Sequence, residues 1–359
     1  MGLQSTDRQV CVRTIKETYP GSRVESHVEQ GYCSFTLLVS PPTLIPESSD
    51  RQKDAHRATS TRSSPPFIVQ LRPQQHSLDE SILRAACSIY KGFAPLVRHL
   101  QCPLPGGLTA AEMDLKKGIP LSTLLAREPH RMNTHTYEKR IRLVESLASF
   151  VGRAWPRATD KATPTRRTRA DSPMLDGPSW LTECTGKVGR NIIPKLEKLS
   201  RQLPDSALRE RARQTLDHLM GIEDYPVVLN HGDLIPTNIL VDETTWEITA
   251  VIDWAEAEWL PFGTCLYGVD HLLGSLDYSS STPRFQFDEG AEVLRMAFWR
   301  KLVEGNRDME ARLEDVTIMR DLGVFLWLGY AWDDGKIDRV VNEVNDAEEL
   351  ARLRAFLSV

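Results

Sequence analysis

The stretch HGDLIPTN, residues 231–238, is the most informative segment of this 359-residue chain. VVL at 227–229 precedes it and ILV at 239–241 follows it, and such β-branched, apolar runs are typical of buried strands. A further apolar run, ITAVI at 248–252, ends at Asp253, fifteen residues after the end of the loop. The pattern predicts a polar loop held between short strands, with a carboxylate at the end of the next strand.

The polar residue types in this region suit phosphoryl transfer. Asp233 can orient an attacking hydroxyl and accept its proton, as a general base does. Asn238 and Asp253 offer oxygen atoms, and Mg²⁺ prefers a few hard oxygens together with phosphate oxygens. We therefore expect Asp233 to be the base and the other two residues to hold Mg²⁺. His231 is expected to brace the loop first and to act in catalysis second.

A simpler interpretation of the same residues stays open. Asp and Asn side chains readily bond to nearby backbone groups, so Asp233 and Asn238 could merely close a turn. Asp253 would then cap a local structure.

The first part of the chain shows β-patterns followed by a helical pattern. Residues 23–40, RVESHVEQGYCSFTLLVS, contain two β-runs on either side of Gly31, which predicts a hairpin. FIVQLR at 67–72 predicts a third strand, whose alternation separates Arg72 from Val69 and Leu71. Apolar residues then recur at helical spacing over 78–93.

A linker divides the chain into two predicted lobes, and a polar tract interrupts each lobe. A short strand and a linker at 116–120 predict an N-terminal nucleotide-binding lobe over 1–115 and a C-terminal lobe over 121–359, which would be catalytic and acceptor-binding. The tracts at 41–66 and 156–178 are rich in Pro, Ser, Thr and Arg, a composition that buries little apolar surface. We expect the first to be a disordered insertion and the second a polar loop.

Helical patterns dominate the second lobe. They fall at roughly 136–155, 180–202, 205–220, 290–304 and 346–357. The predicted fold class is therefore α+β, with a small β-rich N-lobe and a larger, mainly α C-lobe.

Charge and composition narrow the partners. Residues 231–359 carry 25 acidic and 11 basic side chains, a net charge of −14. This favours a cationic acceptor such as an amine-bearing alcohol, although acidic surfaces also serve solubility. The basic tracts lack interleaved aromatic residues, so no nucleic-acid partner is expected. Without a long apolar run or a secretory signal, and with six scattered cysteines, the chain is expected to be cytoplasmic and to have no membrane partner.

HGDLIPTNILVD and VIDWAEAEWLPFG resemble the aminoglycoside phosphotransferase and choline kinase family, most closely its fungal members. The resemblance extends from about Arg23 to the end, through QGYCSFTLLV, IVQLRP and YAWDDGKIDRVVNEV. It implies a protein-kinase-like bilobal fold that binds ATP, or less often GTP, between the lobes. The implied activity is transfer of the γ-phosphoryl group to a hydroxyl of a small metabolite.

The resemblance also implies nucleotide-binding residues in the N-lobe. Arg72 stands where the family carries its phosphate-contacting Lys or Arg. Glu80, or else Asp79, would pair with it, although both could simply complement the helix dipole. Met113 lies in the strand before the linker and would also contact the nucleotide. The turn that would cover the nucleotide consists of Gly31, Tyr32, Cys33 and Ser34.

Two departures from the family pattern bear on function. The insertion at 41–66 lengthens a connection that is usually tight, and an Asp-Pro pair is missing after the Ile-Asp-Trp motif. Glu256 and Glu258 could face the cleft, or could be solvated or start a helix. A non-catalytic nucleotide-binding scaffold is the alternative to an enzyme. A protein kinase is disfavoured, because no activation-loop ending follows Asp253.

Overall fold

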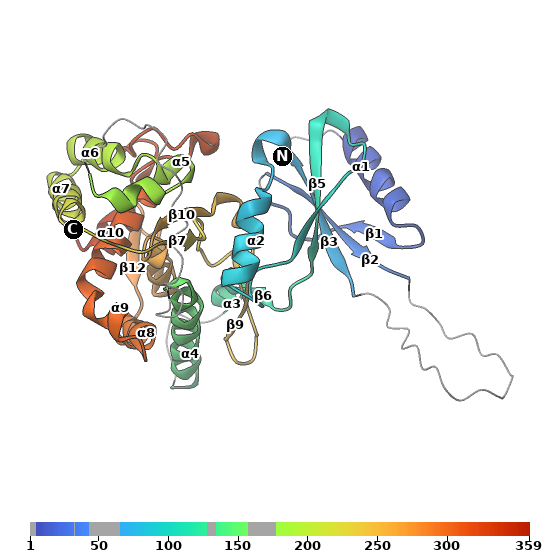
Figure 1. The fold of residues 1–359 in the computed structure, drawn as a ribbon. Coiled ribbons are helices and arrows are strands. Elements are labelled where there is room, and N and C mark those ends of the chain that lie inside the picture. The colour runs from blue at the N-terminus through green and yellow to red at the C-terminus, as the bar shows by residue number, and fades with distance from the viewer. Residues whose placement is uncertain (1–4, 32, 43–64, 128–133, 157–176) are drawn as a thin grey trace, which may run out of the picture. The chain divides into compact units, whose positions relative to one another are not determined.

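The computed structural model of the chain describes residues 5–31, 33–42, 65–127, 134–156 and 177–359 (Figure 1). The predicted disordered insertion and polar loop lie outside these residues, apart from a few positions at their ends.

The described residues form two compact units. The smaller unit runs to Arg84 and resumes at Pro95–Lys116, whereas the larger comprises Ala85–Ala94 and Lys117–Val359.

A five-stranded antiparallel sheet forms most of the smaller unit, in the strand order β1-β2-β3-β5-β4. The predicted hairpin and third strand are confirmed. In the third strand Val69 and Leu71 are fully buried while Ile68 is half-buried, as its alternation predicted. The five strands are β1 (Arg23–Ser26), β2 (Phe35–Ser40), β3 (Phe67–Pro73), β4 (Val97–Leu100) and β5 (Leu108–Asp114).

Helix α1 (Ser5–Thr18) covers this sheet and was not predicted. Its fully buried Cys11 and Ile15 join Leu37 and Val69 in one apolar core. Most of its other residues are polar, so the sequence shows only a weak helical pattern. The predicted helix after β3 is confirmed as α2 (Glu80–Ile89), and the remaining connections contain the 3-10 helices η1 (Gln74–His76) and η2 (Pro105–Gly107).

The larger unit is mainly helical. The helices expected near 136–155, 205–220, 290–304 and 346–357 are confirmed. The α-helices are α3 (Leu121–Arg127), α4 (Thr134–Val151), α5 (Gly186–Gly189), α6 (Ile192–Gln202), α7 (Ser206–Met220), α8 (Ala291–Val303), α9 (Arg307–Ala311), α10 (Leu313–Leu328) and α11 (Ala347–Leu357). The 3-10 helices are η3 (Gly152–Ala154), η5 (Ser179–Glu183), η6 (Trp254–Glu256), η7 (Leu266–Leu272) and η8 (Asp333–Gly335).

The single helix predicted over 180–202 is wrong. The segment is broken into η5, α5 and α6, because Cys184 and Thr185 are extended and Gly186 has φ +86°. Glycine adopts this left-handed conformation without steric cost, and it turns the chain between the helices.

Short strands of the larger unit hold the polar loop as predicted. Two small sheets flank it, one of β7 with β10 and one in the order β6-β8-β9. A separate hairpin joins β11 to β12. The strands are β6 (Ile119–Pro120), β7 (Val227–Asn230), β8 (Ile239–Val241), β9 (Ile248–Val251), β10 (Glu258–Pro261), β11 (Gly274–Asp277) and β12 (Arg284–Phe287).

Helix α10 is the centre of the larger unit, and it was also missed. Residues on all its sides are buried, among them Leu322, Val324, Phe325 and Leu326. Residues 321–326 are all buried, so the second half of the helix has no polar face and no amphipathic periodicity to reveal it.

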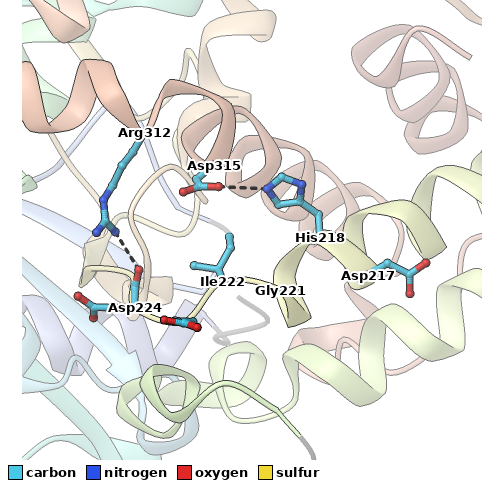
Figure 2. A pocket seen from close by; sticks show the side chains of 8 residues that line it. Asp217, His218, Gly221, Ile222, Asp224, Arg312 and Asp315 are labelled. Atoms are coloured by element: carbon cyan, nitrogen blue, oxygen red, sulfur yellow. Dashed lines mark hydrogen bonds and ion pairs between the residues drawn. The ribbon is translucent and has the colours of Figure 1, made fainter.

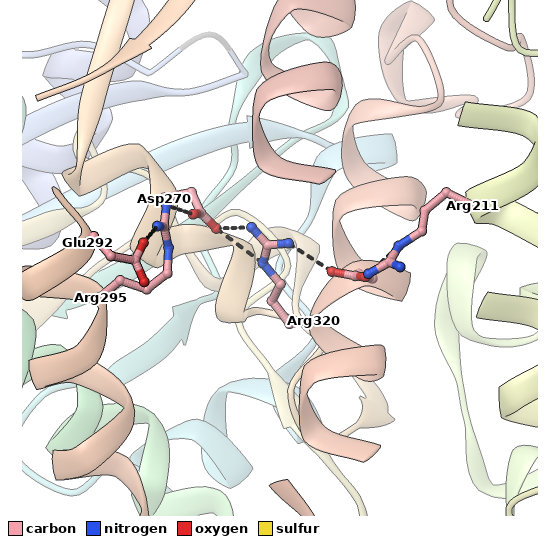
Figure 3. Close-up of polar contacts among 6 residues, drawn as sticks. Arg211, Asp270, Glu292, Arg295 and Arg320 are labelled. Atoms are coloured by element: carbon pink, nitrogen blue, oxygen red, sulfur yellow. Dashed lines mark hydrogen bonds and ion pairs between the residues drawn. The ribbon is translucent and has the colours of Figure 1, made fainter. Parts of the chain in front are cut away.

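A buried chain of charges links the helices around α10 (Figure 3). Asp270 of η7 is fully buried and binds both Arg320 of α10 and Arg295 of α8. Arg320 also contacts Asp321 at 2.8 Å, and Asp321 contacts Arg211 of α7 at 2.6 Å. These buried carboxylates are paired with arginine, as burial of a charge requires.

The β-rich smaller unit and the mainly helical larger unit confirm the α+β fold class. Among the helices that the structure describes, none has the length and apolarity needed to cross a bilayer.

Candidate active site

The second residue of the loop between β7 and β8, Gly232, has no room for a side chain in the present conformation. Gly232 has φ +79°, and a Cβ placed on it would lie 1.9 Å from the carbonyl oxygen of Glu256. Because that contact is with backbone, it cannot be relieved by a side-chain rotation. The loop is thus packed directly against the segment that follows β9.

His231 is a buried, neutral brace for this loop. Its Nε2 donates to the carbonyl oxygen of Ile252 at 2.8 Å, and its Nδ1 accepts from the Asp233 N–H at 3.3 Å. The ring lies edge-on to Trp254, with centroids 4.7 Å apart. Burial lowers the pKa of His231 to about 4, so the ring carries no charge near neutral pH. This geometry fits the bracing role better than the catalytic one.

Asp233 and Asn238 touch each other across the loop. The Asn238 Nδ2 donates to the Asp233 carboxylate at 2.8 Å and to the Asp233 carbonyl oxygen at 2.9 Å. Burial raises the pKa of Asp233 to about 6, and the negative charges of Asp253 and Glu256 add to this rise. Asp233 is therefore mostly ionised at neutral pH and yet more basic than an ordinary aspartate.

Asp253 lies at the end of β9, as the sequence predicted, in an unusual backbone conformation. It has φ 61° and ψ 68°, the left-handed region that non-glycine residues seldom adopt. The neighbouring backbone is fixed, because the Ile252 N–H donates to the Asn238 carbonyl oxygen at 2.9 Å. Trp254 is buried and donates its indole N–H to the Val251 carbonyl oxygen at 2.9 Å. It is thus a core residue.

Glu256 and Glu258 have different surroundings. Glu258 is buried, and its carboxylate accepts from the backbone N–H groups of Val188 and Gly189 at 3.1 and 3.0 Å. It therefore binds the start of α5 from strand β10, and it neither is solvated nor starts a helix of its own. The half-buried Glu256 follows Asp253 closely enough to raise the pKa of Asp233.

The chemistry of the donor set fits Mg²⁺. Both hydrogen bonds of the Asn238 amide use Nδ2, which leaves its Oδ1 available as an oxygen ligand. Together with the carboxylates of Asp233 and Asp253 this gives a set of hard oxygens. Within the described part of the chain, no group of three His, Cys, Asp or Glu residues is arranged to hold a metal by itself. Hard oxygens of this kind suit Mg²⁺, which also takes phosphate oxygens as ligands.

The other predicted site residues belong to the smaller unit. Ser34 donates its N–H to the Gly31 carbonyl oxygen at 3.4 Å, which closes the turn between β1 and β2. Ser34 is buried and Cys33 is half-buried, whereas Tyr32 lies outside the described residues. Met113 is buried in β5 opposite Ile68.

The structure does not bring Arg72 and Glu80 together. The buried Arg72 donates from Nε and Nη2 to Gln70 Oε1 at 3.2 and 3.1 Å. Glu80 is exposed and bonds to Arg84 one turn further along α2, at 2.6 Å. Asp79 accepts from the N–H groups of Ser81 and Ile82 at the start of the helix. The helix-start roles given as the alternative are thus the ones observed.

A hollow of about 580 Å³ lies elsewhere in the larger unit (Figure 2). Its charged groups satisfy one another in part: His218 contacts Asp315 at 3.1 Å, and Arg312 donates to the Asp224 carbonyl oxygen at 2.8 Å. None of the predicted catalytic residues lines it. Its lining comprises Asp217, His218, Gly221, Ile222, Glu223, Asp224, Arg312 and Asp315.

Sequence reasoning missed the residues that support the loop from outside. Tyr267 and Trp327 contact it from η7 and α10. They lie far along the chain from HGDLIPTN, and no local spacing connects them to it.

The model of the phosphotransferase enzyme family (APH) matches residues 48–264, more than half of the chain. The chain belongs to this family. It is accordingly a small-molecule kinase of the aminoglycoside phosphotransferase type with a protein-kinase-like fold, and the family's reaction is ATP-dependent phosphoryl transfer to a hydroxyl. No curated protein sequence matches the chain.

Several solved structures are similar over most of the chain. A thermostable mutant of aminoglycoside phosphotransferase APH(4)-Ia, in a ternary complex with AMP-PNP and hygromycin B, has 17% identity, 97% coverage of both chains and a TM-score of 0.48. A putative aminoglycoside phosphotransferase from Ralstonia eutropha JMP134 has 11% identity, 98% coverage of both and a TM-score of 0.47. APH(3'')-Id from Streptomyces rimosus, with ADP and streptomycin, has 14% identity, covers 88% of this chain and 98% of its own, and has a TM-score of 0.41.

Proposed function

We propose that the chain moves the γ-phosphoryl group of ATP to a hydroxyl of a small metabolite, with Asp233 as the base and Mg²⁺ held by Asn238 and Asp253. The observation that carries this proposal is the 2.8 Å contact between Asn238 and the Asp233 carboxylate, on a loop bonded through Ile252 to the strand end at Asp253. The fixed loop keeps a base and two oxygen ligands together.

Asp233 has the chemistry of a general base. The acceptor hydroxyl would lose its proton to the Asp233 carboxylate as its oxygen bonds to the γ-phosphorus, and the bond from that phosphorus to the β–γ bridging oxygen breaks. Asn238 holds Oδ2 of the carboxylate, which leaves Oδ1 for the acceptor. A pKa of about 6 keeps most of the Asp233 population ionised at pH 7 and strengthens it as a base.

Asn238 and Asp253 would hold Mg²⁺ through Oδ1 and a carboxylate oxygen. The ion would neutralise charge on the β- and γ-phosphates when bound. The same residues also fix the loop, so a loss of either would affect both metal and base.

The smaller unit would bind the nucleotide. Its turn over residues 31–34, the buried Arg72 and Met113 of β5 are the groups that we assign to this task. A guanidinium can contact phosphate oxygens at two points, so an arginine can serve in place of a lysine there. A cytoplasmic location belongs to the same proposal.

The acceptor would be an amine-bearing alcohol. Among the described residues, no arginine or lysine forms an ion pair with Asp233 or Glu256, although both are half-buried. An ammonium group on the acceptor would compensate this negative charge, because opposite charges attract most strongly where water is partly excluded. A screen in which only neutral or anionic alcohols react would reject this part of the proposal.

Mass spectrometry tests the activity directly. Purified protein, Mg²⁺ and ATP would be incubated with a library of hydroxyl-bearing metabolites and aminoglycosides, and products would be sought that gain one phosphoryl group. Asp233→Asn is expected to reduce turnover by about 10²- to 10⁴-fold, the usual contribution of a general base. Nucleotide binding should persist in this variant.

Asp242→Asn is the matched control. Asp242 is exposed and only accepts backbone N–H groups in a turn, which an asparagine can also do. Full activity of Asp233→Asn would refute the proposal. Tight, Mg²⁺-dependent nucleotide binding without transfer to any acceptor would instead support the non-catalytic scaffold.

A further inference from the structure

Tyr267 of η7 binds the loop on both sides of Asp233. Its side chain is buried, and its hydroxyl donates to the carbonyl oxygen of Gly232 at 3.0 Å. The same oxygen accepts from the N–H of Leu234 at 3.2 Å. One phenol therefore holds the peptide groups immediately before and after the residue that we propose as the base.

Trp327 of α10 supports Tyr267 from behind. The two rings are stacked, with centroids 5.8 Å apart and planes at 17°. The Trp327 ring also reaches the loop, because its Cη2 lies 3.2 Å from the point where a Cβ on Gly232 would stand. The indole also opposes the rise of the Asp233 pKa.

Tyr267 itself is held rigidly. The ring of His271 lies edge-on to the Tyr267 ring, with centroids 6.0 Å apart. Asp270, three residues after Tyr267 in η7, is bound to Arg320 of α10. Burial raises the pKa of Tyr267 far above its usual range, so its hydroxyl keeps the proton that it donates. The phenol is thus a fixed donor and acceptor.

The metal-binding half of the loop is held by other contacts. The Asn238 N–H donates to the Ile235 carbonyl oxygen at 2.9 Å, and the Asn238 carbonyl accepts from Ile252. Loss of the Tyr267 hydroxyl would therefore free the backbone around Asp233 while leaving Asn238 in place. The side chain of Asn238 bonds to Asp233, but its backbone contacts do not involve Tyr267.

We propose that Tyr267, supported by Trp327, is a positioning residue that fixes the direction of the Asp233 side chain. This inference rests on the proposed function of Asp233 as the base. Its physical reason is that a carboxylate must point at one hydroxyl, and a displacement of about 1 Å can reduce a rate on the order of 10²-fold. The aromatic pair supplies the restraint from two elements that lie outside the loop.

Tyr267→Phe tests the proposal, because it removes only the hydroxyl and keeps the ring against Trp327. We expect kcat to fall on the order of tenfold to a hundredfold. The Kd for Mg²⁺ with AMP-PNP should not change, because the contacts of Asn238 remain. A residue that only stabilises the fold would not separate kcat from nucleotide affinity in this way.

Tyr225→Phe is the matched control. Tyr225 is equally buried in the same unit, and its hydroxyl donates to the Phe262 carbonyl oxygen at 3.0 Å. Its removal costs one comparable buried hydrogen bond away from the loop. Unchanged kcat in the control supports the proposal, whereas equal losses in both variants would overturn it.

Amide hydrogen exchange at Leu234 gives a readout that does not require activity. In Tyr267→Phe the Leu234 N–H loses its acceptor, so its exchange should accelerate on the order of tenfold, while Tyr225→Phe leaves it unchanged. If the wild-type chain transferred no phosphoryl group, the proposed function would fail, and the exchange data would still decide whether Tyr267 restrains the loop. Unchanged Leu234 exchange in Tyr267→Phe would overturn the proposal.

Trp327→Phe provides a second variant should Tyr267→Phe not fold. It keeps an aromatic ring beside Tyr267 and removes the indole N–H and the larger ring surface. We expect a smaller loss of kcat than in Tyr267→Phe, with nucleotide affinity again unchanged. A wild-type kcat in this variant would remove Trp327 from the proposal.

Discussion

Two groups of carboxylates in the larger unit have opposite surroundings. Asp270 and Asp321 are almost fully buried, and each is bound by arginine (Figure 3). Asp233 and Glu256 are half-buried, and among the described residues neither has an arginine or lysine ion pair. The first group joins helices, whereas the second surrounds the loop of the candidate active site.

The contrast shows that burial together with an arginine partner is typical of structural carboxylates, whereas burial without such a partner is typical of functional ones. Burial of a charge is tolerated when a partner neutralises it, and the paired group then contributes to a single packed arrangement. Asp233 is partly buried beside other negative charges, so its pKa is raised, and a carboxylate of this kind attracts a cation from outside the protein. The energetic cost of the second arrangement is expected where the chain needs to bind a metal or to accept a proton.

The largest effect on stability should come from breaking the paired group. Asp270→Asn leaves the largely buried Arg320 and the half-buried Arg295 without their shared carboxylate, and we expect the free energy of unfolding to fall by about 3–5 kcal/mol. Urea unfolding measures this change. Asp217→Asn, at an exposed position on α7, should stay within about 0.5 kcal/mol of the wild type. Similar stabilities for both variants would contradict our description of the network.

The proposed metal site should respond in activity rather than in folding. Asp253→Asn is expected to lower kcat by about 10²- to 10³-fold, in the range found when one pre-organised group at a developing charge is removed. The Mg²⁺ concentration for half-maximal rate should rise, because one charged ligand is lost. Initial rates over a Mg²⁺ titration measure both quantities. An unchanged half-maximal concentration would exclude Asp253 as a ligand.

The smallest expected effect is an increase in the free energy of unfolding, in contrast to the decrease expected for Asp270→Asn. The folded-state pKa of Asp233 is raised to about 6, so the ionised carboxylate destabilises the fold above that pH. Asp233→Asn removes this charge and should increase the free energy of unfolding at pH 7 by about 1–3 kcal/mol, since one pKa unit corresponds to about 1.4 kcal/mol.

The pH dependence of this difference provides the check. Between about pH 4 and pH 6 the folded wild type holds a proton on Asp233 that the unfolded chain has released. The wild type therefore gains stability as the pH falls through this window, and the advantage of Asp233→Asn should vanish near pH 4. Buried His231 and His271 have lowered pKa values and destabilise the fold in acid, but they do so in both proteins. A difference that does not change with pH would contradict this account.

Much of the fold was predictable from local pattern. The alternation in FIVQLR identified β3, and the apolar runs around HGDLIPTN identified β7, β8 and β9. The wrong and missing helix predictions arise where the local pattern does not reflect the structure. The second half of α10 is buried on every side and shows no helical period, whereas the predicted helix over 180–202 is interrupted where Gly186 turns the chain.

The candidate site was predictable only where its residues are close in sequence. Asp233 and Asn238 share one loop, and Asp253 follows β9, the strand that pairs with β8, so local pattern could predict that these residues belong to one region. Tyr267 and Trp327 reach the loop only through tertiary packing. The partner of Glu258 could not be predicted either, because it consists of backbone N–H groups at the start of α5.

The residue at the position of Gly232 indicates whether a related chain keeps the conformation of this loop. A side chain at this position would start 1.9 Å from a backbone oxygen of the segment after β9, in a conformation that already disfavours one. A descendant that keeps this loop in its present conformation must therefore keep the glycine. In a related chain with any other residue there, the loop or the segment after β9 must have a different conformation. Such a substitution therefore indicates a chain that keeps the fold but has lost the arrangement of the candidate active site.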